Sequence, residues 1–140
     1  MPVRRKREPY RVFVSHSHKD RWIAKHMVKE MEDLGKARVE VFLDEKDIEV
    51  GQHIAKEVRE AIAKCDEFVV LLSPNSKGRE WVLLELGAAW GLEKPIMVIL
   101  HDLSPQKMPD VTYPHKATDL NHFDTVYLGQ LRERMEKRSR

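Results

Sequence analysis

The chain has 140 residues, of which 41% are hydrophobic and 34% are charged, and its formal net charge is +2. These values are typical of one globular domain with a strongly charged surface, not of a disordered or membrane-embedded chain. The near-neutral balance gives no reason to expect nucleic acid as a partner, because that binding depends on many Lys and Arg contacts to phosphates. The only cysteine, Cys65, excludes an intrachain disulfide and a zinc site built from several thiolates.

Basic residues gather near the two ends of the chain, within residues 3–8 and 132–140. We expect a basic N-terminal tail over residues 1–10, followed by a single domain over residues 11–140. No apolar stretch approaches the length of a membrane span, and no apolar segment follows the basic N-terminal residues as in a secretory signal. The sequence therefore predicts a cytoplasmic protein without a membrane partner.

Four short runs are apolar at nearly every position, as in strands that are buried on both sides of a parallel sheet. They cover residues 11–15, 39–43, 67–72 and 96–100. We expect the following side chains of these runs to be buried: Val12, Val14, Val41, Val69, Leu71, Met97, Val98 and Ile99. Residues 117–120 could form a short edge strand.

Helical patterns lie between the strands. A stripe of apolar residues three or four positions apart predicts the first two helices: Ile23, Met27, Met31 and Leu34, then Ile54, Val58, Ile62 and Cys65. A third helix is predicted over residues 80–91, and a last one over 124–137. Strands that alternate with helices indicate a doubly wound parallel α/β sheet of about five strands, flanked by helices.

Ligands of such sheets bind beyond the carboxyl ends of the strands. This edge is made by residues 15–20, 44–52, 73–80 and the segment from residue 101 onward. The chain contains neither a glycine-rich dinucleotide fingerprint nor a phosphate-binding loop, and its seven histidines lack metal-ligand spacing. We therefore expect no bound cofactor and no metal.

Two of these edge segments have a simple structural interpretation beside a functional one. Ser15 or Ser17 could cap the first helix while His16 and His18 are merely exposed, or the segment could form a polar floor for a ligand. The charged loop 44–52 could be a solvated surface loop. Its apolar residues Ile48 and Val50 suggest instead a partner surface or a lid.

The third helix carries one carboxylate, Glu85, in an otherwise apolar run from Trp81 to Gly91. Trp81 and Glu85 are four residues apart, so they share one face of the helix. Glu85 could pair with a neighbour such as Arg79 or Lys94. Alternatively, it could face the cleft, where a carboxylate stabilises a developing positive charge and accepts bonds from sugar hydroxyls, as cleavage of a glycosidic bond requires.

Three stretches in this order, residues 11–20, 42–76 and 80–86, resemble a Toll/interleukin-1 receptor (TIR) domain of the prokaryotic type. The resemblance implies a flavodoxin-like fold and, for many members, an enzyme that cleaves nicotinamide from NAD. Glu85 matches the catalytic glutamate of those members, and Trp81 matches the aromatic residue that lines the pocket. Ser15 and His16 match residues beside the substrate.

The same resemblance implies that Lys46, Asp47 and Gly51 belong to a loop that gates the pocket, and that this loop, with Ile48 and Val50, joins neighbouring subunits. The implied function is an NAD glycohydrolase of defence or cell-death signalling that forms homo-oligomers, with a sensor or effector protein as a further partner. Two alternatives remain at this point: a non-catalytic TIR interaction module, and a nucleoside hydrolase or deoxyribosyltransferase.

Overall fold

The computed structural model describes residues 8–35, 38–43, 56–76, 80–108 and 117–138. Its centre is a sheet of five strands, all parallel, in the order β2-β1-β3-β4-β5. The strands are β1 (Tyr10–Ser15), β2 (Val39–Leu43), β3 (Glu67–Leu72), β4 (Ile96–Leu100) and β5 (Ala117–Asp119). The predicted flavodoxin-like, doubly wound α/β class is confirmed, and the predicted strand bounds agree to within one residue.

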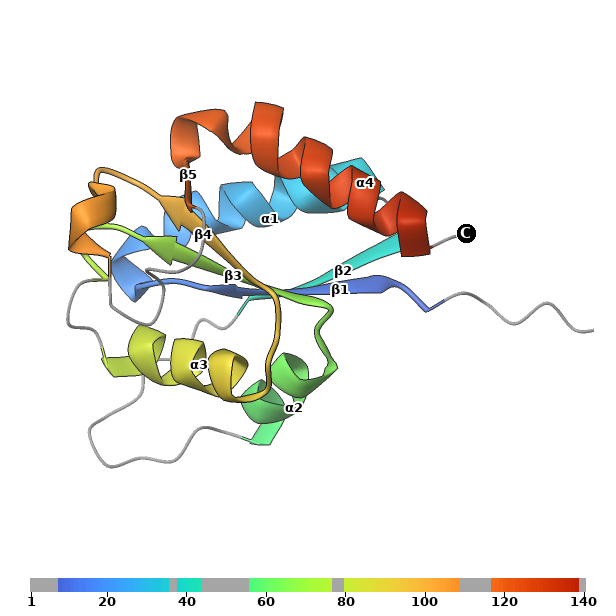
Figure 1. Cartoon of the computed structure of the whole chain (residues 1–140), viewed down its shortest axis with the longest axis horizontal. Coiled ribbons are helices and arrows are strands. Elements are labelled where there is room, and N and C mark those ends of the chain that lie inside the picture. Colours follow the sequence, from blue (N-terminus) through green and yellow to red (C-terminus); the bar gives the residue numbers. More distant parts are fainter. Residues whose placement is uncertain (1–7, 36–37, 44–55, 77–79, 109–116, 139–140) are drawn as a thin grey trace, which may run out of the picture.

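Helices cover both faces of the sheet (Figure 1). α1 (Arg21–Gly35) and α4 (Leu128–Arg138) pack on one face, and α2 (Lys56–Lys64) and α3 (Glu80–Gly91) pack on the other. A short π-helical turn, η6 (Phe123–Tyr127), precedes α4. The predicted last helix is therefore regular only in its second part.

Three phenylalanines hold the centre of the sheet together. Phe13 of β1 lies opposite Phe42 of β2 and Phe68 of β3, and its ring stacks on both, with centroid distances of 5.2 Å and 5.3 Å. Because side chains alternate along a strand, Ser15 points to the same face as Phe13, the face that α2 and α3 cover. This stack thereby fixes the direction of the last side chain of β1.

Six of the eight predicted core residues are buried, but Val41 and Met97 are only partly buried. For these two the prediction was wrong, and both errors have the same cause. Val41 belongs to β2, which is an edge strand. Met97 lies one residue before the first described pair between β4 and the three-residue strand β5, Val98 and Ala117, so the described part of β5 does not extend to it.

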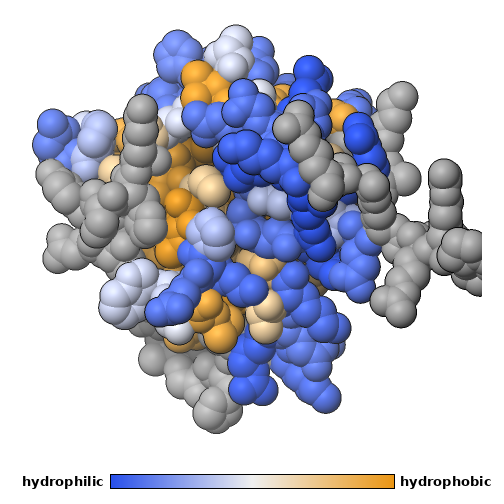
Figure 2. All heavy atoms as spheres, turned by 45° about the vertical axis from the view of Figure 1, so that its right-hand side comes forward, coloured by the Kyte–Doolittle hydropathy of each residue, from blue (hydrophilic) through white to orange (hydrophobic). Residues whose placement is uncertain are grey.

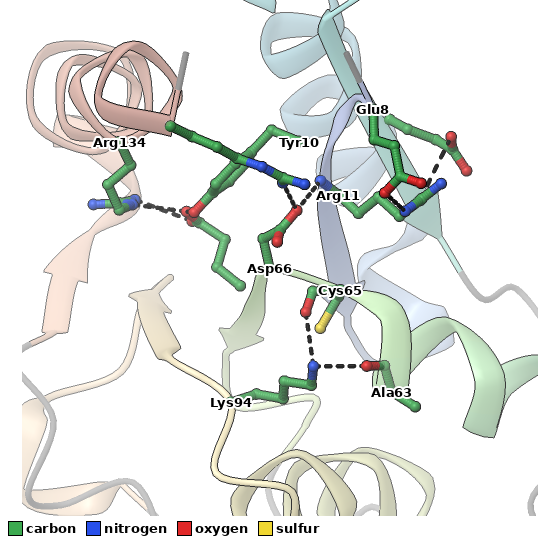
Figure 3. Close-up of polar contacts among 11 residues, drawn as sticks. Glu8, Tyr10, Arg11, Ala63, Cys65, Asp66, Lys94 and Arg134 are labelled. Atoms are coloured by element: carbon green, nitrogen blue, oxygen red, sulfur yellow. Dashed lines mark hydrogen bonds and ion pairs between the residues drawn. The ribbon is translucent and has the colours of Figure 1, made fainter. Parts of the chain in front are cut away.

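The amino edge of the sheet contains a fully buried carboxylate, Glu67, at the start of β3. It accepts hydrogen bonds from Tyr10 Oη (2.6 Å), Tyr127 Oη (2.6 Å), and Arg134 Nε and Nη2 (2.7 Å and 3.0 Å). Figure 3 shows Tyr10 and Arg134 converging on this point from different elements. Four donors balance the cost of burying this charge and bind the η6–α4 segment to the sheet.

The surface has broad hydrophilic areas that are interrupted by apolar patches (Figure 2). In the part of the chain that the structure describes, no helix is both long enough and apolar enough to cross a membrane.

We predict that Glu67→Gln destabilises the protein by about 3 kcal/mol, because it leaves the Arg134 guanidinium largely buried without its carboxylate. Urea denaturation monitored by circular dichroism measures this change. Glu136→Gln, on the exposed side of α4, is the matched control and should change the free energy of unfolding by less than about 0.5 kcal/mol. Equal stability of the two variants would contradict the prediction.

Stability should also fall at alkaline pH. Burial raises the pKa of the Cys65 thiol to about 11, and burial together with the Glu67 charge raises the pKa of Tyr10 and of Tyr127. Because the folded state holds these protons more tightly, their contribution is complete below the unfolded pKa values and is lost as the pH rises.

The thiol's part of this loss should lie between about pH 9 and pH 11. Unfolding free energies measured at several pH values for the wild type and for Cys65→Ala isolate it. Parallel pH profiles for the two proteins would show that the thiol makes no such contribution.

Candidate functional site

The candidate site lies at the carboxyl edge of the sheet. β1 lies between β2 and β3 in the sheet. After β1 the chain continues into α1 on one face of the sheet, and after β3 it continues into α3 on the other face. In open α/β sheets, the crevice at such a reversal of strand order is where ligands bind. Ser15 ends β1, and Ser73 directly follows β3, so both hydroxyls lie at this point.

Glu85 reaches this edge from α3. The carboxylate is 1% exposed, and its Oε1 accepts a hydrogen bond of 2.8 Å from Ser15 Oγ, which is equally buried. α3 is positioned for this contact by Val82, Leu86 and Ala89, which pack into the core cluster on that face of the sheet. The structure thus joins two of the predicted site residues, 70 positions apart in the sequence.

Lys94 is not a partner of Glu85. Lys94 follows the C-terminal end of α3, and its ammonium donates to the carbonyl oxygens of Ala63 (2.6 Å) and Cys65 (3.0 Å). Figure 3 shows both contacts. The structural interpretation of Glu85 as an ion-pair partner of Lys94 is therefore wrong. The other suggested partner, Arg79, lies outside the described residues.

His16 is buried beside Ser15, whereas His18 is exposed. The expectation that both histidines are simply exposed was therefore wrong for His16. Its Nδ1 lies 2.8 Å from the carbonyl oxygen of Ser17. Since a carbonyl only accepts, we assign a proton to Nδ1. The predicted capping role belongs to Ser17, whose side chain accepts from Lys19 N at the 3-10 turn η1 (His18–Asp20).

Sequence reasoning missed a second buried carboxylate at this edge, Asp20, which is 2% exposed. Its Oδ2 accepts from Ser73 Oγ (2.5 Å) and its Oδ1 accepts from Asn75 Nδ2 (2.8 Å). Ser76 Oγ completes the group, because it accepts from Ser73 N and donates to Ser73 O. Asp20 therefore ties the turn after β1 to the loop that leads from β3 into α3.

No local pattern could have revealed this link. Asp20 ends a polar segment that reads as a helix cap, and Ser73 is 53 positions away. Both residues lie in segments that follow neighbouring strands, Asp20 after β1 and Ser73 after β3. This position predicted that both segments lie at the ligand-binding edge, but it did not predict the hydrogen bond between them.

The remaining predicted site residues are not placed. Lys46, Asp47, Ile48, Val50 and Gly51 lie outside the described residues, and Trp81 is described only as part of the α3 backbone.

The arrangement suits the stabilisation of a positive charge. A carboxylate removed from water interacts more strongly with a nearby cation than a solvated one does, and the fixed Ser15 hydroxyl leaves it little freedom to turn away. Within the described ranges, no three His, Cys, Asp or Glu side chains form a group that could hold a metal ion.

The fold and the edge site define an α/β protein of the flavodoxin-like class. A family model described as "TIR domain" matches residues 12–135. The chain belongs to the TIR domain family.

Curated relatives are distant. The chain is 28% identical to NAD(+) hydrolase TcpC of Escherichia coli, over 79% of this chain and 36% of that protein. It is 28% identical to the probable 2′ cyclic ADP-D-ribose synthase BdTIR of Brachypodium distachyon, over 91% and 53%. It is 30% identical to Protein toll of Drosophila melanogaster, over 70% and 10%. The chain thus spans from a tenth to about half of the length of these relatives.

Solved structures confirm the fold. The TIR domain of the Toll-related receptor TRR-2 from Hydra magnipapillata superposes with a TM-score of 0.68 at 20% identity, covering 89% of this chain and 97% of that one. The TIR domains of the activated Roq1 resistosome superpose with a TM-score of 0.63 at 17% identity, covering 94% and 99%.

We predict that Asp20→Asn lowers the free energy of unfolding by about 1–3 kcal/mol, because an amide cannot accept from both Ser73 and Asn75. The loss should be local, so amide hydrogen exchange should accelerate at residues 73–76 more than in β3. Asp33→Asn, on the exposed side of α1, is the control. Unchanged exchange at residues 73–76 would show that Asp20 does not hold this loop.

Proposed function

We propose that this protein is an NAD glycohydrolase that cleaves the bond between nicotinamide and ribose. The observation that carries the proposal is the buried Glu85 carboxylate, which accepts from Ser15 at the carboxyl edge of the sheet. The family supports it, since two distant relatives are named for reactions of NAD or of cyclic ADP-ribose. The expected role is in defence or cell-death signalling.

Glu85 would act as the catalytic residue. Cleavage of the nicotinamide–ribose bond leaves positive charge on the ribose carbon and ring oxygen, and a carboxylate beside the sugar stabilises this oxocarbenium character. Nicotinamide departs as a neutral pyridine, so the leaving group needs no strong acid. Attack by water would give ADP-ribose, and attack from within the substrate would give a cyclic isomer.

Ser15 would lie beside the substrate and position the carboxylate. Its hydroxyl proton is used in the bond to Glu85 Oε1, and its oxygen could still accept a hydrogen bond from the sugar. His16, in the assigned tautomer, would offer Nε2 as a hydrogen-bond acceptor. Trp81, Lys46 and Asp47 complete the proposed substrate-binding residues.

The proposal treats NAD as a substrate, with no further cofactor or metal, and places the protein in the cytoplasm. Assembly with other copies would involve the loop that contains Asp47, Ile48, Val50 and Gly51. A sensor or effector protein remains a proposed partner.

A non-catalytic interaction module is the alternative. The observation that favours it is the apolar outer side of α3, where Leu83, Leu84 and Trp90 are exposed. This alternative predicts no release of nicotinamide from NAD by the purified protein. A panel of nucleosides, assayed in parallel, tests the nucleoside hydrolase or transferase interpretation.

We predict that Glu85→Gln slows NAD cleavage by about a thousandfold or more, equivalent to about 4 kcal/mol of barrier. The amide keeps the shape of the side chain and still accepts from Ser15, but the charge is gone. Nicotinamide release measured by chromatography gives the rate, and thermal unfolding of the same sample gives the stability. Folding should be unaffected or improved, because the substitution neutralises a buried charge.

Two control variants sharpen the test. Glu67→Gln removes the other fully buried glutamate and should lower stability, while the chemistry of its folded fraction persists. Ser15→Ala should reduce the turnover rate by roughly tenfold to a hundredfold, with a smaller change in KM, because it frees the carboxylate to turn. Retained cleavage in a destabilised Glu85→Gln protein would refute the catalytic role of Glu85.

A further inference from the structure

A cavity of about 360 Å³ lies between α1 and the turn that follows β5 (Figure 1). On one side it is lined by residues that share one face of α1: Trp22, Ile23, His26, Met27 and Glu30. On the other side it is lined by the 3-10 turn η5 (Leu120–His122) and the start of η6, through Leu120, Asn121, Phe123 and Asp124. We call this cavity the α1 hollow. Its volume is at the lower end of the range for small-molecule sites.

Both walls of the hollow are fixed to the sheet. Met27 and Phe123, which form its floor, belong to the core cluster on this face. Phe123 stacks on Tyr127 at a centroid distance of 5.0 Å, and Tyr127 Oη donates to the buried Glu67. The hollow is therefore formed before any ligand binds, which lowers the entropic cost of binding. The wall that η6 provides is a π-helical turn, a rare structure that is frequently found at functional sites.

The polar side chains of the hollow favour a positive charge. Besides His26, its ionisable residues are two exposed carboxylates, Glu30 and Asp124, and none of the residues that line it is a Lys or an Arg. In the described part of the chain, neither carboxylate forms an ion pair. Trp22 is 75% exposed, and its ring meets the His26 ring edge-on at 4.9 Å. Two carboxylates without a counter-ion, beside an uncovered indole, are a suitable environment for an organic cation.

We propose that the α1 hollow binds a small organic cation, an alkylguanidinium. Its alkyl part would lie on the apolar floor made by Ile23, Met27 and Phe123. Its guanidinium would lie against the Trp22 ring and donate to the two carboxylates. A guanidinium suits this site better than an ammonium, because it is planar, stacks on aromatic rings and donates paired hydrogen bonds to a carboxylate.

The proposed ligand is a free molecule and not the arginine of a partner protein. A stable protein interface buries roughly 1,000 Å² or more, whereas the features that favour a cation are confined to one small hollow. The inference does not depend on the proposed enzymatic activity. The α1 hollow lies on one face of the sheet, and α3, which carries Glu85, packs on the other.

Titration with butylguanidinium, followed by two-dimensional NMR of the backbone amide and indole N–H groups, tests the proposal. Signals of residues 22–30 and 120–124 and the indole of Trp22 should shift and saturate, while those around Glu85 stay in place. Butylurea is the matched control ligand, because it has nearly the same shape without the charge. It should bind at least about tenfold more weakly, and added salt should weaken only the binding of butylguanidinium.

Variants of the hollow locate the binding energy. Glu30→Gln and Asp124→Asn should each weaken the binding of butylguanidinium by about threefold, and Trp22→Ala should weaken it by about fivefold. Glu32→Gln, on the exposed side of α1 outside the hollow, is the control and should bind as the wild type does. All four side chains are exposed, so thermal unfolding should remain close to that of the wild type.

Equal affinity of the wild type for butylguanidinium and butylurea would overturn the proposal. An equal loss of affinity in Glu32→Gln would also overturn it, because it would indicate unspecific attraction to the acidic surface. A capped Gly-Arg-Gly peptide distinguishes the source of the guanidinium and should bind no more tightly than butylguanidinium. Tighter binding of the peptide would refute the free ligand and would assign the hollow to an arginine of a partner protein.

Discussion

The fold depends on one buried charge at the amino edge of the sheet. Glu67 receives hydrogen bonds from the first strand, through Tyr10, and from the last part of the chain, through Tyr127 and Arg134. Without these bonds, η6 and the first part of α4 would lose their polar link to the sheet, and Arg138 at the end of α4 would keep its ion pair with Asp66. The hydrogen bonds of this network offset the desolvation free energy of the buried carboxylate, and they also fix the position of the final helix.

The carboxyl edge has the opposite character. Glu85 is as buried as Glu67, but the donor identified for it is a neutral hydroxyl, Ser15, in place of a guanidinium and two phenols. One carboxylate lies in a cluster that joins β1, β3 and α4, and the other lies at the edge where parallel sheets bind ligands. This difference in place supports a stabilising role for Glu67 and the catalytic role proposed for Glu85.

The sequence was sufficient for the fold because each buried strand is a continuous apolar run, the first two helices each have an apolar stripe, and the third is apolar at nearly every position. It failed at Val41 and Met97, where burial depends on the pairing of neighbouring strands and not on the residue itself. At the site, the chain pattern and the family resemblance together marked Ser15 and Glu85, and the structure joined them. The hydrogen bond between Asp20 and Ser73 was not predicted, because two residues 53 positions apart leave no local pattern in the sequence. The roles of Glu85 and the loop residues stay predictions.

Asp66 has a further consequence. Its carboxylate accepts from the backbone N–H of Arg11, near the start of β1, and pairs with Arg138 at the end of α4. The start of β1 and the end of α4 therefore meet at Asp66. Figure 1 shows them at the amino edge of the sheet, and Ser15 and Glu85 lie at the carboxyl edge. A fusion partner attached at either end would leave the carboxyl edge open. For the same reason, a short linker could join the two ends in a circular permutant without crossing the candidate site.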